Sequence, residues 1–169
     1  LDRASDKNSA ALEEITYEGY GPGGIGIIIE TATDNRNRTL PEVKTALVKN
    51  GGRIADAGSV MFQFARKGVI RVNVSGEDAL LTILDAGAED AVEEDGEVIV
   101  YTDPKSLTAV RQSIIDAGLP VLDAELQYVP LNEVDIADEE TAAKVMKVMD
   151  ALDDVADVVN VHTNANVIE

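Results

Sequence analysis

Two neighbouring segments carry the residue types that bind phosphate in proteins. The first, residues 19–24 (GYGPGG), has the G-x-G-x-x-G spacing of dinucleotide-binding loops. Such a loop needs a helix after it, whereas here a β-branched apolar run follows. We therefore interpret it as a tight connection between two strands, with glycine supplying positive φ angles. A loop whose backbone closely approaches a partner is the open alternative, and its residues are Tyr20, Gly21, Pro22, Gly23 and Gly24.

The second segment, residues 34–38 (DNRNR), precedes a predicted helix. A helix N-terminus carries free N–H groups and partial positive charge. Arg36 and Arg38 beside it would form a phosphate site, with Asn35 and Asn37 in the same loop. The alternative is a solvated loop that asparagine side chains fold into turns.

Basic residues are concentrated in one part of an otherwise acidic chain. The formal net charge is −18, yet residues 36–71 hold eight basic and two acidic side chains. A positive block of this kind indicates an anionic partner. We predict a positive face that binds this partner, made of Arg36, Arg38, Lys44, Lys49, Arg53, Arg66, Lys67 and Arg71.

Residues suited to catalysis or metal binding are scarce. The chain has no cysteine and one histidine, His162, near the end of a predicted strand. This excludes a thiol nucleophile and a cysteine-bound zinc ion, and a lone histidine cannot form a metal cluster. The acidic runs at 93–97 and 138–140 are interpreted as a hairpin tip and a helix start. We predict no catalytic residue, no metal site and no cofactor.

The elements that position the two segments follow from apolar spacing. Strands are predicted at residues 14–18, 25–31 and 60–65. A helix is predicted between the second and the third. Thr39 is its expected N-cap, Glu42 its capping-box partner, and glycines 51–52 its end.

The next part of the chain predicts a self-contained β-α-β-β-α-β module. Its strands are expected at residues 69–74, 88–93, 97–102 and 121–129, with helices ending at Gly87 and Gly118. Asp95-Gly96 is a strong hairpin signal between the two middle strands. This order is the ferredoxin-like arrangement.

A helix at 139–152 and a strand at 155–162 have no partners nearby, so we expect them to complete the first sheet. The predicted fold class is α+β, with two α/β-sandwich domains, the second inserted into a discontinuous first domain. The expected boundaries are 13–66 with 132–169 for the first domain and 67–131 for the ferredoxin-like one.

Four motifs resemble those of the YebC/PmpR family, whose relatives include the mitochondrial translational activator of cytochrome oxidase subunit one. They are residues 17–24 (YEGYGPGG), 33–39 (TDNRNRT), 58–60 (GSV) and 67–70 (KGVI). The resemblance runs from Glu13 onward and implies the inserted layout. It also implies that residues 1–12 are a remnant or linker of a basic N-terminal helical domain that this chain lacks.

The resemblance further implies a non-enzymatic gene-expression factor, bacterial and cytoplasmic, or in the mitochondrial matrix if the source is eukaryotic. We favour a translation factor that acts on ribosomes stalled at proline-rich sequence, because no helix-turn-helix, zinc-finger or RRM pattern is present to read bases. The alternatives are a transcriptional regulator that binds promoter DNA, and a protein-binding module that uses its acidic surface. The expected partner is the ribosome or ribosomal RNA, or promoter DNA. The chain is expected to be a monomer and not to bind membranes.

Overall fold

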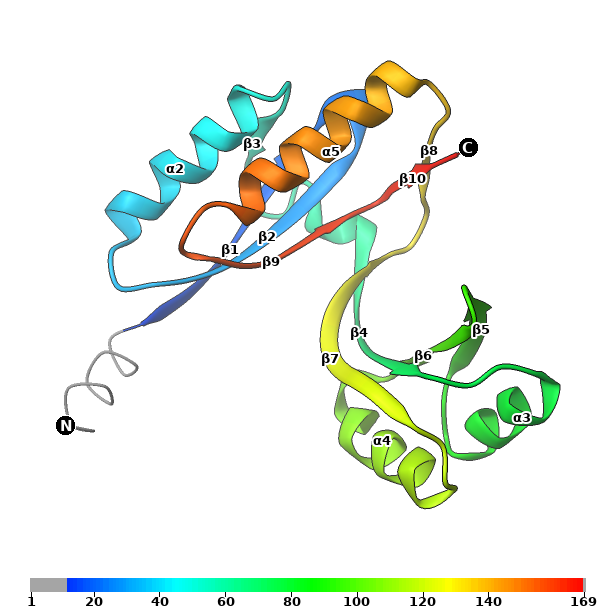
Figure 1. Cartoon of the computed structure of the whole chain (residues 1–169). Coiled ribbons are helices and arrows are strands. Elements are labelled where there is room, and N and C mark those ends of the chain that lie inside the picture. The colour runs from blue at the N-terminus through cyan, green and yellow to red at the C-terminus, as the bar shows by residue number, and fades with distance from the viewer. Residues whose placement is uncertain (1–11, 169) are drawn as a thin grey trace. The chain divides into compact units, whose positions relative to one another are not determined.

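The computed structural model describes residues 12–168, which divide into two compact units (Figure 1). Unit 1 ends at Phe64 and resumes at Pro130, and unit 2 is Ala65–Val129. The predicted domain boundaries lie two residues later at both junctions. The predicted remnant at 1–12 lies, except for Leu12, outside the described residues.

Unit 1 is built on a four-stranded antiparallel sheet. Across it run β3 (Arg53–Ala55), β1 (Glu13–Tyr20), β2 (Gly26–Thr33) and β9 (Val158–Thr163). A short parallel pair, β8 (Val134–Ile136) with β10 (Ala165–Val167), lies beside it in the chain's C-terminal part. The C-terminal strand thus completes the first sheet, as predicted, and begins at Val158 rather than at 155.

Helices α2 (Arg36–Val48) and α5 (Glu139–Asp153) lie side by side over one face of this sheet (Figure 1). Their apolar residues pack on alternate residues of β2, and Asp138 caps α5 by accepting the Thr141 N–H at 2.8 Å. The core of unit 1 includes Ile25, Ile27, Ile29, Val43, Leu47, Val145, Val148 and Leu152.

The opposite face of β2 is also covered, which explains why three consecutive isoleucines are fully buried. Ile28 points away from the helices and pairs with Glu18 of β1. The Glu18 carboxylate accepts N–H groups from a segment between β3 and β4, at 2.7 Å from Gly58, 2.8 Å from Val60 and 2.7 Å from Met61. These bonds hold that segment against the sheet.

Unit 2 has the ferredoxin-like order. Its elements are β4 (Phe64–Val72), α3 (Glu77–Asp85), β5 (Asp90–Glu94), β6 (Glu97–Thr102), α4 (Leu107–Asp116) and β7 (Val121–Pro130). The strand order β5-β6-β4-β7 places the two middle strands of the sequence next to each other, joined by the predicted Asp95-Gly96 turn. Both turn residues have positive φ, 51° and 80°. The α+β class with an inserted second unit is confirmed.

Three elements differ from the prediction. Helix α2 begins at Arg36, so Thr39 is a buried residue of the helix and not its cap. The hydroxyl of Thr39 donates instead to Asp157. Asp157 lies 118 residues away, so no local sequence pattern predicts this contact. Residues 60–65 are not a strand, because Met61–Gln63 form a 3-10 turn and β4 runs unbroken from Phe64. The short strand β3 was not predicted.

Within the described residues, no helix combines the length and apolar character that crossing a membrane requires.

Candidate nucleic-acid interface

The eight predicted phosphate-binding residues are divided between the two units. Arg36, Arg38, Lys44, Lys49 and Arg53 belong to unit 1, and Arg66, Lys67 and Arg71 to unit 2. Their surroundings decide which of them are available to a ligand. Those of unit 1 do not share one face of that unit.

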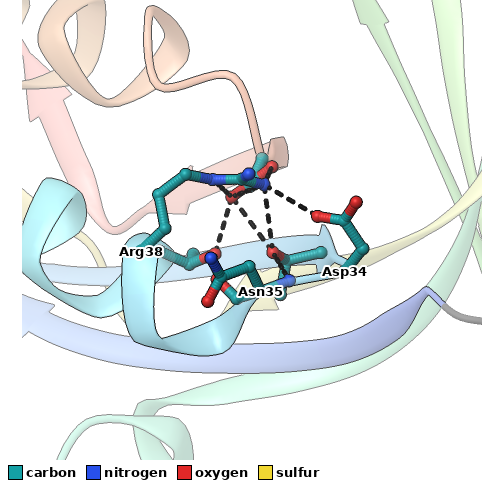
Figure 2. Close-up of polar contacts among 6 residues, drawn as sticks. Asp34, Asn35 and Arg38 are labelled. Carbon is teal, nitrogen blue, oxygen red and sulfur yellow. Dashed lines mark hydrogen bonds and ion pairs between the residues drawn. The ribbon is translucent and has the colours of Figure 1, made fainter.

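Arg38 is committed to a buried carboxylate at the start of α2. Its Nη2 lies 2.8 Å from Oδ1 of Asp157, and its Nε lies 3.1 Å from Oδ2. The hydroxyls of Thr39 and Thr33 donate to the same Oδ2 at 2.6 and 3.1 Å. Figure 2 shows the Arg38 side chain turned toward Asp34, whose carboxylate it meets at 3.1 Å. Arg38 therefore ties the helix to the chain preceding β9.

The same contacts set the charge of the network. The hydrogen bond from Thr39 is the main cause that holds the pKa of Asp157 below its usual value, against the opposing effect of burial, and Arg38 and Thr33 add to the lowering. The Asp157 hydrogen bond raises the pKa of Arg38 further above its ordinary value. Both groups stay ionised as one structural ion pair.

The predicted arginine loop is in fact the first turn of α2. Asn35 occupies the N-cap position, and its backbone N–H donates to the Thr33 hydroxyl at 2.9 Å. Arg36 and Asn37 are exposed helical residues. Arg36 meets Glu13 at 3.3 Å in a pair that is open to solvent on both sides, so it contributes about 0–1 kcal/mol and leaves Arg36 accessible.

The three predicted cations of unit 2 are engaged with groups of the same unit. Lys67 lies 2.7 Å from Glu89. Arg71 contacts Glu97 through two nitrogens at 3.0 Å and Asp123 at 2.7 Å. The Glu97 hydrogen bonds are the leading cause that raises the pKa of Arg71. The Arg66 guanidinium stacks over the Tyr128 ring at 4.2 Å.

Of the predicted cations of unit 1, two that carboxylates leave available lie on helix α2 and at its C-terminal cap. This helix holds three basic residues and one acidic one, whereas each of the other three α-helices that the structure describes has at least as many acidic as basic residues. Lys44 and Lys49, at and just beyond its last turns, are exposed and form no ion pair with any described residue. An open groove of about 590 Å³ separates Lys49 from Asp154 beyond the end of α5.

Arg53 lies on the other side of the sheet. It stacks over the ring of its cross-strand partner Tyr20, with 4.5 Å between guanidinium carbon and ring centre. Tyr17 packs into the core beneath the helices, so Tyr20, three residues later in the same strand, points to the opposite face. Arg53 therefore stands apart from Lys44 and Lys49.

The glycine segment connects β1 to β2, as predicted. Gly21 donates its N–H to the Ile25 carbonyl at 3.0 Å, and Gly23 and Gly24 have φ angles of 78° and 80°. Pro22 is buried. A side chain at Gly23 would start 2.8 Å from the Ile136 Cδ1 atom, so this position is closed by packing as well as by backbone conformation.

Sequence reasoning missed the two buried carboxylates and the partner of the lone histidine. Burial raises the pKa of Glu18, but its three backbone N–H donors outweigh burial and hold the pKa below the usual value. Neither Glu18 nor Asp157 stands in a motif that would predict burial. His162 Nε2 lies 2.6 Å from Oε2 of Glu30 on the neighbouring strand. The described residues contain no group of three potential ligands that could hold a metal ion.

Comparisons with known proteins agree with this architecture. A family model described as "TACO1/YebC second and third domain" matches residues 12–165. A "Probable transcriptional regulatory protein" of Thermobifida fusca is 48% identical over 166 residues, covering 96% of this chain and 66% of the relative. Its counterpart in Moorella thermoacetica is 44% identical over 163 residues, covering 94% and 65%. The chain thus spans about two thirds of the length of these curated relatives.

A solved structure is similar as well. The crystal structure of a conserved hypothetical protein, Aq1575 from Aquifex aeolicus, superimposes with a TM-score of 0.89 at 40% sequence identity. The match covers 94% of this chain and 67% of that one.

Proposed function

The chain belongs to the TACO1/YebC family of gene-expression factors, and within that family we propose that it binds nucleic acid without catalysing a reaction. The observation that carries this proposal is the pair Lys44, in helix α2, and Lys49, its C-terminal cap. In a chain with a net charge of −18, these two exposed lysines have no carboxylate partner among the described residues, and they belong to the one described α-helix and cap in which basic residues outnumber acidic ones. Arg36, the first residue of the same helix, adds a third cation, which is paired, within the described part of the chain, only with an exposed glutamate.

We propose that the target is structured RNA of the ribosome, and that the chain acts in translation, on ribosomes stalled at proline-rich sequence. Lysines on a helix surface contact phosphates, which position a protein without reading bases. A folded RNA with dense phosphate suits such contacts, since RNA is recognised largely by shape and charge. The acidic remainder of the chain would repel phosphate elsewhere and so orient the molecule.

Promoter DNA is the second candidate, because the curated relatives are named as probable transcriptional regulatory proteins. A direct comparison of binding distinguishes the ribosomal RNA target from the promoter DNA target. We expect the chain to co-sediment with ribosomes and to bind a ribosomal RNA fragment more tightly than a promoter duplex at the same salt concentration. Stronger binding to the duplex would favour the transcriptional role. In a reconstituted translation system, added protein should raise the yield of a proline-rich reporter more than that of a proline-free one.

The double variant Lys44→Ala/Lys49→Ala tests the proposed interface. Removing two phosphate contacts should weaken RNA binding at about 0.1 M salt by at least about tenfold. It should also reduce the slope of log K against log salt by about 1.4 for a single-stranded RNA, or by about 1.8 for duplex DNA. Filter binding over a salt series measures both quantities.

The matched control is Lys144→Ala/Lys147→Ala, which removes the same charge from the exposed surface of α5 in the same unit. This control should bind almost as the unaltered chain does. If the two double variants lose affinity equally, only net charge matters and the α2 interface is wrong. If neither loses affinity and a basic protein is bound instead, the acidic surface is the binding site.

A further inference from the structure

We propose that a cavity in unit 1, beside the exposed ring of Phe62, holds one unpaired nucleobase. This inference rests on the proposed binding of nucleic acid and adds a specific site to it. The cavity measures about 270 Å³ and is lined by Phe62, Gln63, Leu131, Asn132, Glu133, Val134 and Asn164. Pockets for drug-sized ligands begin at about 300 Å³, so this one suits a single base-sized group.

The apolar part of the cavity is unusually open to solvent. Phe62 is 70% exposed and Leu131 61%, although the chain contains only two phenylalanines and no tryptophan. A flat aromatic face with an aliphatic neighbour is the surface on which unpaired bases stack. Because every base has a π-face, such a platform binds single-stranded segments and excludes the paired bases of a duplex.

The segment that carries the ring is held rigidly before any ligand arrives. Glu18 accepts the N–H groups of Val60 and Met61, the two residues before Phe62, at 2.8 and 2.7 Å. Val60 is fully buried, and its carbonyl accepts the Gln63 N–H at 2.9 Å. A ring presented from a preordered backbone loses little conformational entropy on binding.

The polar groups of the cavity match the edges of a base. Asn164 is fixed, since its Oδ1 accepts the Gly26 N–H at 2.8 Å and its Nδ2 donates to Gln63 Oε1 at 3.0 Å. This leaves Gln63 Nε2 as a donor, the Asn132 amide as donor and acceptor, and the Glu133 carboxylate as an acceptor. Glutamine and asparagine pair with adenine edges, and a carboxylate accepts from the amino group of cytosine.

The negative charge of Glu133 determines how a nucleotide would enter the cavity and which bases it would prefer. A carboxylate at the cavity repels phosphate, so the ligand enters base first with its phosphate outside. The same carboxylate favours bases that carry an exocyclic amino group, so adenine, cytosine and guanine should bind better than uracil.

Arg53 lies at the same end of the unit 1 sheet as the cavity, and on the same face of that sheet. Gly26, whose N–H is bonded to Asn164, is the cross-strand partner of Tyr20, and Arg53 stacks on the Tyr20 ring. A side chain at Gly26 would point toward Val60, Gln63 and Asn164, so the paired Tyr20 points to that face too. Arg53 is therefore placed to contact the phosphate of a neighbouring nucleotide.

The test uses the full chain, a single-stranded RNA oligonucleotide with one 2-aminopurine, and three variants. Phe62→Ala should weaken binding by about 5- to 150-fold and abolish the fluorescence quenching that base stacking causes. Phe62→Trp keeps a ring and should retain the quenching. Leu81→Ala, an exposed apolar residue of unit 2, is the control and should leave both readouts unchanged.

A second measurement probes the cavity with mononucleotides alone. Adenosine and cytidine 5′-monophosphate should shift the side-chain amide NMR signals of Gln63 and Asn132 at lower concentrations than uridine 5′-monophosphate does. If the oligonucleotide binds but Phe62→Ala matches the unaltered chain, the base site is wrong and the α2 interface stands. If a proline- or aromatic-containing peptide shifts these amides and the nucleotides do not, the cavity holds a protein side chain and the proposal is overturned.

Discussion

At the residue scale, Asp157 organises the start of α2 and should contribute strongly to stability. We expect Asp157→Asn to lower the free energy of unfolding at pH 7 by about 2 kcal/mol, because charge-assisted bonds from Thr39 and Arg38 are lost. The folded pKa is lowered, so the contribution of the carboxylate is complete above its unfolded value of about 3.9 and disappears as the pH falls through the folded value. The difference between the two proteins should therefore shrink below about pH 4 in denaturant titrations.

Asp34→Asn is the matched control, since Asp34 meets the same guanidinium at 3.1 Å but its side chain is 62% exposed. An exposed pair of this kind is worth about 0–1 kcal/mol. Equal destabilisation by the two variants, or a loss in Asp157→Asn that stays constant to pH 3, would show that the buried network has no special role.

The same residues show where sequence reasoning about the site succeeded and failed. The turn chemistry of Gly23 and Gly24 was predictable, because positive φ is a local property of glycine. The role of Arg38 was not, because its partner lies 119 residues away in sequence. The exposure of Phe62 could not be predicted for a different reason. Alternating apolar residues at 60, 62 and 64 are typical of a strand, yet a 3-10 turn leaves the middle one exposed.

At the element scale, strands with continuous β-branched residues and hairpins with strong turn residues were predicted well. β2, β6 and the Asp95-Gly96 turn depend on local pattern alone. The start of α2 was misplaced because Thr39 and Glu42 form a capping-box pattern that tertiary contacts override. β3 is only three residues long, which is too short to show the alternation of apolar and polar residues that predicts a strand.

The central strand β4 of unit 2 depends on a glycine. A Cβ at Gly68 would lie 2.2 Å from Thr102 Oγ1 and 2.9 Å from the Leu107 Cβ. Thr102 could turn away only by losing its hydrogen bond to the Asp103 carbonyl, and the Leu107 Cβ can move only with the backbone of α4. Gly68→Ala should lower the free energy of unfolding of unit 2 by about 1–3 kcal/mol through overpacking. Thermal denaturation measures this loss.

Gly118→Ala separates packing from backbone strain. Gly118 has a φ of 85° and no atom near its missing Cβ, so this variant carries the conformational cost alone, about 1 kcal/mol. A Gly68→Ala protein as stable as the unaltered chain would mean that β6 or α4 moves freely, contrary to the packing described.

At the scale of the whole molecule, the acidic residues have a structural use in unit 2. β5 is an edge strand of its sheet, and it carries Asp90, Glu93 and Glu94 at exposed positions. Charges on an edge discourage pairing with another chain. The negative charge therefore protects an exposed sheet edge and also keeps phosphate away from this unit.

The inserted arrangement leads to a prediction about folding. Unit 2 closes its own core, since Ile70, Val98, Val110 and Ile114 pack together with residues of the same segment. The fragment 65–129 should therefore fold alone, as many domains of about 55–65 residues do, and give a dispersed NMR spectrum with cooperative thermal unfolding. The fragment 12–64 should not fold. It lacks β9 beside β2, and it lacks α5, whose Val148 and Leu152 complete the core of unit 1. Both fragments are compared with the whole chain under the same conditions. A disordered spectrum for 65–129 would show that unit 2 depends on unit 1. A folded spectrum for 12–64 would show that unit 1 does not need β9 and α5. Either result would make the domain assignment wrong.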